Sequence, residues 1–189
     1  KMAERFKDHP AVVGLNLYNE PSPERTDPML RDWYTGDYEK WYAKIKGTPQ
    51  DLNLFYRKII KSIRKVDKKI PIILDSGFYG TPYALKIMDP EILADDNLVY
   101  SFHHYIPYRF ISSANRGRFQ YPGNIPTGEL DLVNDENAYP PFAPVEPWNK
   151  QRMKEFYKPI VDWMNEHGVS SEQMYVGEFG AHRSQKGVI

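Results

Sequence analysis

Two glutamates end apolar runs of the sequence, where a carboxylate is costly to bury. Glu20 closes LNLYNEP (residues 15–21), and Glu178 lies in QMYVGEFG (residues 173–180). A single case has a plain structural explanation, because Pro21 would end a strand and leave Glu20 facing water at the corner. Two carboxylates in one pocket would instead suit acid–base and nucleophilic chemistry, since different surroundings can drive their pKa values apart.

An imidazole and a phenol end a third apolar run, NLVYSFHHYIP (residues 97–107). Alternate side chains of a strand share a face, so His103 and Tyr105 are expected to act together. His104 is expected on the opposite face. A histidine at the end of a strand often has only a structural hydrogen-bonding role. The prediction of a site therefore depends on polar residues occurring at the ends of other strands as well.

The same two-residue period predicts the surroundings of Glu178. It places Glu178 on one face with Val176 and Met174, while Gly177 and Gly180 leave room for a close approach. Because parallel strands end at one edge of a sheet, we expect Glu20, His103, Tyr105 and Glu178 to converge there.

The chain alternates between strand and helix patterns. Near-continuous apolar runs, typical of strands covered on both faces, occupy residues 11–18, 71–77, 97–107 and 173–180. Helical patterns occupy residues 48–67, 81–89 and 149–168, and the first ten residues resemble the tail of a helix. This alternation predicts βαβ units, and hence either a doubly wound sheet or a (β/α) barrel.

The three longer helices carry recognisable end signals. Thr48 and Thr81 are the predicted N-caps of the first two, each followed by proline, and Gly168 ends the third. Pro159 is expected to kink the third helix. The predicted buried stripe of the first helix consists of Leu52, Phe55, Ile59, Ile63 and Val66.

Composition narrows the possible partners. The chain has 189 residues, 41% of them apolar, which is enough for a real core and suggests one domain. Lysine plus arginine and aspartate plus glutamate number 25 each, so no charge excess indicates nucleic acid or an anionic membrane. No apolar stretch is long enough to cross a bilayer. A neutral, sugar-like substrate agrees with this balance.

Paired carboxylates of this kind are the equipment of glycoside hydrolysis. One carboxylic acid protonates the leaving oxygen, and the second carboxylate attacks the anomeric carbon. Three motifs point to the same chemistry: VVGLNLYNEP, LVYSFHHYIPY and MYVGEFGAHR resemble the strand-four, strand-six and strand-seven signatures of family 5 glycoside hydrolases, the cellulase-type (β/α)8 barrels.

This resemblance implies roles for individual residues. Glu20 would be the general acid/base and Glu178 the nucleophile of a retaining mechanism, about 5–5.5 Å apart. Asn19 would hydrogen-bond the 2-hydroxyl of the sugar, His103 would hold substrate or the acid/base, and Tyr105 would orient the nucleophile. No cofactor and no metal are implied.

The resemblance also implies that the barrel is incomplete in this chain. A full barrel needs roughly 250 residues, and residues 1–189 correspond to about strands four to seven, in one partial (β/α)8 catalytic domain. Four strands cannot close a barrel, and open edges are unfavourable. We therefore expect a fragment, a cleaved chain or one partner of an assembly in which a complementary chain supplies the missing strands, and we do not expect the isolated chain to be active.

The expected substrate is a β-1,4-glucan, with endo action. A β-mannanase or another β-glycosidase of the family is the alternative, as is a non-catalytic carbohydrate-binding fragment. Polymeric substrates suggest a secreted or periplasmic protein. The long loops, residues 21–47 and 107–148, follow strands and supply candidate sugar platforms, although loop aromatics usually pack on their own loop: Trp33, Trp41, Tyr121 and Trp148.

A metal-dependent hydrolase is the third hypothesis. It would use His103, His104 and His182 with the glutamates. Adjacent histidines point in opposite directions on a strand, and no metal-binding spacing occurs in the sequence, so this signal is weak.

Overall fold

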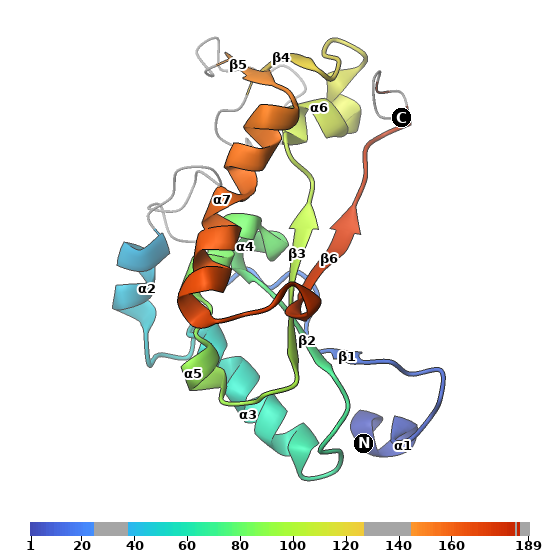
Figure 1. The fold of residues 1–189 in the computed structure, drawn as a ribbon, viewed down its shortest axis with the longest axis vertical. Coiled ribbons are helices and arrows are strands. Elements are labelled where there is room, and N and C mark those ends of the chain that lie inside the picture. The colour runs from blue at the N-terminus through green and yellow to red at the C-terminus, as the bar shows by residue number, and fades with distance from the viewer. Residues whose placement is uncertain (25–37, 127–144, 184, 186–189) are drawn as a thin grey trace.

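The computed structural model describes residues 1–24, 38–126, 145–183 and 185, and its centre is a sheet of four parallel strands in the order β1-β2-β3-β6 (Figure 1). Apart from the excursion that carries β4 and β5, each strand lies beside the next along the chain. A doubly wound sheet reverses its direction, whereas a barrel advances one way, so this order favours the (β/α) barrel. The strands are β1 Leu15–Asn16, β2 Ile72–Asp75, β3 Leu98–His104 and β6 Met174–Phe179.

All four strands were predicted, but β1 is much shorter than its apolar run. Leu15 pairs with Ile72 and Asn16 with Ile73, and the next pairing along the sheet joins Ile72 to Leu98. Among the described residues only one side of β1 is paired, which leaves it a short edge strand.

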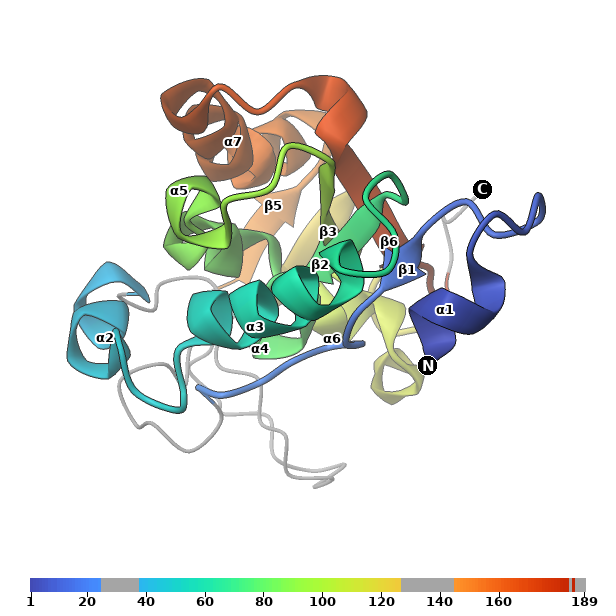
Figure 2. The same cartoon turned by 90° about the horizontal axis from the view of Figure 1, so that it is seen from below.

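The main helices lie on one side of the sheet (Figure 2). They are α3 Leu52–Arg64, α5 Pro90–Leu93 and α7 Lys150–His167, with α1 Met2–Phe6 and α2 Tyr38–Ile45 further out. Shorter elements are α4 Gly77–Gly80, α6 Tyr108–Ile111, and the 3-10 helices η2 Pro82–Ile87, η3 Ser113–Asn115 and η4 Ser171–Gln173. Beyond the carboxyl ends of β3 and β6 in Figure 1, β4 Gly123–Pro126 pairs antiparallel with β5 Val145–Trp148.

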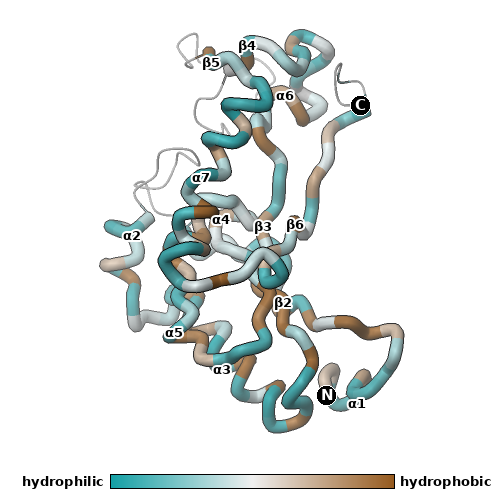
Figure 3. Tube along the Cα trace, viewed as in Figure 1, coloured by the Kyte–Doolittle hydropathy of each residue, from teal (hydrophilic) through white to brown (hydrophobic). Residues whose placement is uncertain are grey.

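The core fills the space between the sheet and these helices. Leu74 and Tyr100 of the sheet pack in one cluster with Tyr56 of α3 and Trp163 of α7. Figure 3 shows hydrophobic segments along β2 and β3, and mixed hydropathy along α7. Each large apolar side chain buried in this way contributes roughly 1.5–3 kcal/mol, so the sheet offers a rigid base for its polar end.

Helix α3 begins later than predicted. Asp51 is the N-cap, and its carboxylate accepts hydrogen bonds from the backbone N–H of Asn53 and Leu54. Thr48 was the predicted cap, but its hydroxyl instead donates to the Ile45 carbonyl at 2.7 Å. Asp51 is therefore the N-cap in place of Thr48, and its negative charge also interacts favourably with the amino end of the helix.

The buried face of α3 differs from the predicted stripe. Leu52, Tyr56 and Ile60 are buried, whereas Phe55 is 41% exposed. The hydroxyl of Tyr56 donates to the Asp75 carbonyl at 2.8 Å, which fixes the rotation of the helix against β2. The ring of Phe55 meets the ring of Tyr18 edge-to-face, with centroids 6.0 Å apart, and lies 5.8 Å from the ring of Tyr56.

The other helix predictions have mixed outcomes. Helix α7 ends at Gly168 in the left-handed conformation, as predicted, and contains Pro159. The expected α-helix over residues 81–89 is instead the 3-10 helix η2, followed by α5, which Asp89 caps.

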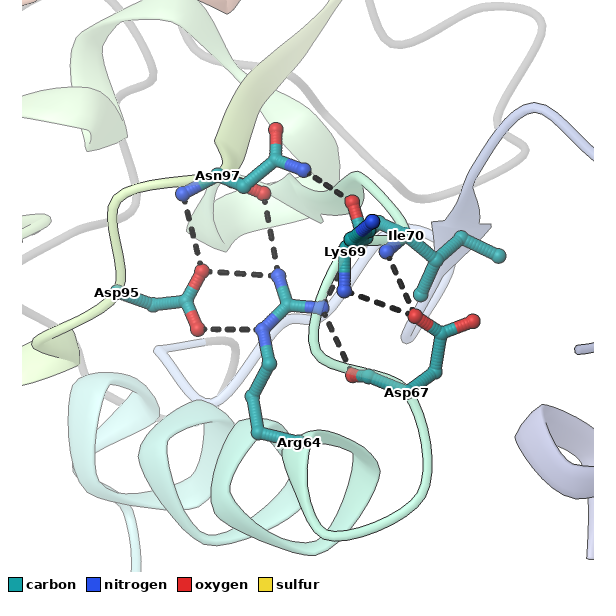
Figure 4. A network of polar contacts seen from close by, with 6 residues as sticks. All are labelled: Arg64, Asp67, Lys69, Ile70, Asp95 and Asn97. Carbon is teal, nitrogen blue, oxygen red and sulfur yellow. Dashed lines mark hydrogen bonds and ion pairs between the residues drawn. The ribbon is translucent and has the colours of Figure 1, made fainter.

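An ion-pair network ties the far end of α3 to the segments that precede β2 and β3 (Figure 4). Arg64 donates two hydrogen bonds to Asp95, at 2.6 and 2.8 Å, and one to the Ile70 carbonyl at 2.7 Å. Asp67 accepts from the backbone N–H of Lys69 and Ile70. The network fixes the amino ends of the strands, opposite the edge where the polar strand ends were predicted to meet.

Candidate active site

The predicted polar side chains converge at the carboxyl edge of the sheet. Glu20 follows β1, His103 lies near the end of β3, Tyr105 follows it, and Glu178 lies in β6. His103 Nδ1 lies 2.9 Å from Glu20 Oε1, and the Tyr105 hydroxyl donates to Glu178 Oε2 at 3.0 Å. Residues far apart in the sequence thus form one cluster.

A β-bulge presents Glu178 to this cluster. Phe102 pairs with Val176 and His103 pairs with Glu178, so Gly177 is an extra residue in β6. Val176 lines a hollow with Phe102 on the helix side, while Glu178 reaches His103 on the other. The prediction that Glu178 shares a face with Val176 and Met174 is therefore wrong, because the inserted residue shifts the alternation by one.

Two glycines give the His103 ring its space. A Cβ on Gly177 would lie 2.6 Å from Ser101 Oγ and 3.1 Å from His103 Nε2. A Cβ on Gly80, whose φ is +73°, would lie 3.0 Å from Cγ of His103. The imidazole is therefore held between two backbone segments that leave it little freedom to turn.

His103 is almost completely buried, and three carboxylates surround its ring. Its Nδ1 faces Glu20 at 2.9 Å and Glu178 at 3.8 Å, and its Nε2 faces Asp75 at 3.3 Å. Burial alone would lower the pKa of His103, but the hydrogen bonds to Asp75 and Glu20 outweigh it and raise this pKa to about 9. His103 is therefore an imidazolium at neutral pH in this arrangement.

Asp75, at the end of β2, is a site residue that the sequence reasoning missed. Its side chain is fully buried, and its carboxylate accepts from Asn16 Nδ2 at 3.3 Å and from the Glu20 backbone N–H at 3.2 Å. Burial opposes its ionisation, yet hydrogen bonds from His103 and the Glu20 N–H lower the pKa of Asp75. The signal was present in PIILDSG, where a carboxylate also ends a buried strand.

The backbone at Glu20 is strained. Its φ is +49°, in the left-handed region that non-glycine residues rarely occupy. Asp75 holds the Glu20 N–H, and the Tyr79 N–H donates to the Pro21 carbonyl at 3.2 Å. These bonds fix the turn that aims the Glu20 side chain at His103.

Tyr105 and His104 occupy different surroundings. Burial, followed by the hydrogen bond and charge of Glu178, raises the pKa of Tyr105, so its hydroxyl remains a donor. His104 faces the helix side, where its Nδ1 is hydrogen-bonded to the hydroxyl of Tyr157. His104 lies outside the cluster, as the two-residue period predicted.

The remaining predicted binding residues have different outcomes. Asn19 is exposed next to Glu20, whereas Trp33 lies outside the described residues. Trp148 is 0% exposed and packs with Phe156 in an apolar cluster. A fully buried ring cannot stack on a sugar, so the platform predicted at Trp148 is wrong. Trp41 is 1% exposed and fails for the same reason.

The cluster has the donor types of a cation site. One ligand atom from each of Glu20, His103 and Glu178 lies within 4.8 Å of the others. The same spacing brings an oxygen of Glu20 and an oxygen of Glu178 within sugar-ring dimensions. Nδ1 of His103 is already engaged by Glu20, so a metal would have to displace a strong hydrogen bond.

The fold and the paired carboxylates place the protein in one structural class, the parallel (β/α) barrels with an acidic site at the carboxyl ends of the strands. The cellulase family, glycosyl hydrolase family 5, matches residues 1–188. The chain belongs to this family.

Related proteins agree with this assignment. Endoglucanase C of Acetivibrio thermocellus is 25% identical over 139 residues, which is 68% of this chain and 39% of that protein. A solved endoglucanase is 24% identical with a TM-score of 0.59, over 98% of this chain and 46% of its own. Endoglucanase Cel5A from Thermotoga maritima is 22% identical with a TM-score of 0.61, over 98% and 47%.

The fold is therefore part of a (β/α)8 barrel. The chain spans less than half the length of these relatives. Within the described residues, no helix is both long and apolar enough to cross a membrane.

Proposed function

We propose that the chain carries the catalytic pair of a retaining glycoside hydrolase that cleaves β-1,4-glucan by double displacement. Glu20 is the general acid/base and Glu178 the nucleophile. The observation that supports this most is that oxygens of the two glutamates approach within 4.8 Å around one imidazole. Such closeness suits direct attack by a carboxylate, because inverting enzymes leave more room for a water.

The reaction has two balanced steps. Glu178 attacks the anomeric carbon while Glu20 transfers its proton to the departing glycosidic oxygen, which leaves a glycosyl ester on Glu178. Water then attacks that carbon as Glu20 takes up the proton of the water, and the Glu178 carboxylate departs. Retention of configuration follows from two inversions.

Neighbouring side chains support these steps. The Tyr105 hydroxyl, 3.0 Å from Glu178 Oε2, orients the nucleophile and stabilises its charge. His103 holds Glu20 through Nδ1. Asn19, exposed beside Glu20, would donate to the sugar 2-hydroxyl.

The substrate class rests on the relatives. Structures of Thermotoga maritima Cel5A were solved in complex with cellobiose and in complex with mannotriose. A β-glucan is therefore our first candidate and a β-mannan the second. Because such polymers are extracellular, we also propose a secreted or periplasmic location.

The described strands make only part of a (β/α)8 barrel. In the described sheet β1 and β6 are open edges. We propose that further segments, or a complementary chain, pair with them, and that residues 1–189 act as one partial catalytic domain. The second candidate function, favoured by these open edges, is carbohydrate binding without turnover.

The decisive variant is Glu178→Ala in the complete protein. We expect turnover of a glucan oligosaccharide to fall by more than about 10³-fold, because no nucleophile remains. Azide should restore part of the activity with an activated aryl glycoside and give the inverted glycosyl azide. Glu172→Ala, at an exposed position in η4, is the matched control and should leave turnover unchanged.

Two outcomes would count against the proposal. Residual turnover that azide does not increase would remove Glu178 from the nucleophile role. Calorimetric binding of cello-oligosaccharides without any release of reducing sugar would favour the binding function instead.

A further inference from the structure

Asp75 contacts both the proposed acid, Glu20, and the histidine that holds it, His103. Its Oδ2 accepts the Glu20 backbone N–H at 3.2 Å and lies 3.3 Å from His103 Nε2. Its Oδ1 accepts from Asn16 Nδ2 at 3.3 Å. With 0% exposure, Asp75 is shielded from bulk solvent, so its ionised carboxylate relies on donors within the protein.

The chemistry of Asp75 dictates the tautomer of its partner. An ionised carboxylate only accepts hydrogen bonds, so the Nε2 that faces it must carry a proton. The lowered pKa of Asp75 keeps it ionised at neutral pH. His103 Nδ1 then has two possible states: it either donates to the Glu20 carboxylate or accepts from the Glu20 carboxylic acid.

We propose that Asp75 is a positioning residue that holds the proton on His103 Nε2, so that His103 Nδ1 and Glu20 Oε1 share a single second proton. The inference rests on the proposed function, in which Glu20 is the acid/base. Asp75, which is fully buried, acts through His103 and the Glu20 backbone.

The surrounding backbone holds the His103 imidazole in one orientation. A Cβ at Gly80 or Gly177 would come within 3.2 Å of the imidazole, so the backbone confines it on both sides. Turning the ring over would exchange Nδ1 and Nε2 only by breaking the bonds to Glu20 and Asp75 together. The arrangement thus resembles a base oriented by a buried carboxylate.

Among the described residues, four titratable groups face His103 and take part in this balance. Asp75 comes from β2, Glu20 from the segment after β1, and Glu178 from β6. The ring of Tyr105 meets the imidazole edge-on with centroids 6.5 Å apart. Three carboxylates against one imidazole favour the shared proton over its loss to solvent.

The shared proton balances through the proposed reaction. In the first step it passes from Glu20 to the departing glycosidic oxygen, which leaves Glu20 ionised and His103 neutral with its Nε2 proton. In the second step the attacking water gives up a proton, and the Glu20–His103 pair takes it back. No other proton donor is required.

The first test reads the tautomer directly. Two-bond proton–nitrogen NMR correlations of the wild-type protein above about pH 9 should show His103 with the proton on Nε2. In Asp75→Asn the neutral side chain no longer enforces that proton, and the signal should move toward the Nδ1-protonated form. A wild-type His103 protonated on Nδ1 would overturn the proposal, whether or not the variant folds.

The second test uses the leaving group. With phenyl β-cellobioside, which needs a proton on departure, we expect kcat/KM of Asp75→Asn to fall about 10²-fold. With dinitrophenyl β-cellobioside, which does not, the fall in kcat/KM should stay within about threefold, because this ratio reports the first step and not the attack of water. Equal losses on both substrates would mean that Asp75 only supports the fold.

The control is Asp89→Asn, which changes another carboxylate that accepts backbone N–H groups, at the cap of α5. It should leave both substrates and the His103 tautomer unchanged. A wild-type protein that shows the expected tautomer but hydrolyses neither substrate would refute the proposed function while leaving the Asp75 assignment intact.

Discussion

Two neighbouring histidines on opposite faces of β3 show what decides protonation in this molecule. His103 and His104 are both withdrawn from solvent, and burial alone lowers the pKa of each. His104 faces Tyr157 and keeps that lowered pKa. His103 faces Asp75 and Glu20, and its pKa rises to about 9. The neighbouring charges, and not the burial, therefore set the direction.

Two buried carboxyl groups repeat this contrast. Asp75 and Glu24 are both 0% exposed. Asp75 has His103 beside it and a lowered pKa. The Phe78 N–H donates to Glu24 Oε2 at 3.0 Å, and among the described residues Glu24 Oε1 has no partner. Burial raises the pKa of Glu24 to about 7.

The largest expected effect is on catalytic activity, and it should differ between substitutions on the two faces of β3. His103→Gln should lower kcat/KM by about 10² to 10⁴-fold, because Glu20 loses its proton partner. His104→Gln, the matched variant, should stay within about threefold. Steady-state rates at neutral pH check both. Similar losses in the two variants would mean that both faces serve the reaction.

The second largest expected effect is the pH dependence that Glu24 gives to the free energy of unfolding. The unfolded-state pKa is near 4.5 and the folded-state pKa near 7, so the folded state retains a proton that the unfolded state has lost. The stabilisation is complete below about pH 4.5 and is lost as the pH rises to about 7, with an upper limit on the order of 3 kcal/mol. Denaturant unfolding across this range measures it.

Glu24→Gln should flatten this part of the stability curve, whereas Glu172→Gln, at an exposed position, should not. His103 contributes in a separate window, since its stabilisation is complete below pH 6.5 and is lost as the pH rises through about 9. A slope in the Glu24→Gln variant between pH 4.5 and 6.5 equal to that of wild type would refute the assignment to Glu24.

The strand-end rule explains how much of the site could be predicted. Parallel strands align their carboxyl ends, so the meeting of Glu20, His103, Tyr105 and Glu178 follows from sequence position. The face of β6 on which Glu178 lies could not be predicted from the sequence. A bulge at Gly177 shifts the alternation of side chains, and composition gives no sign of it. Asp75 was missed although the same rule applied to it.

Tertiary packing determined the buried face of α3 and the burial of Trp148, which the sequence pattern alone could not predict. The pattern located α3, but the Tyr56–Asp75 bond chose its buried face. Trp148 lies next to a proline-rich segment that suggested exposure. It is buried because β5 pairs with β4 and brings the ring against Phe156, a contact that no local pattern encodes.

The smallest expected effect lies on the helix side of β3. Tyr157→Phe removes the hydroxyl that is hydrogen-bonded to His104 and should cost about 1 kcal/mol of unfolding free energy. Tyr175→Phe, whose ring is 48% exposed, is the control and should change little. Neither should alter kcat/KM, because no contact of Tyr157 reaches the carboxylates among those described. If Tyr157→Phe reduced turnover as strongly as His103→Gln, then the helix face would control the site through β3, and the separation between the two histidines would not hold.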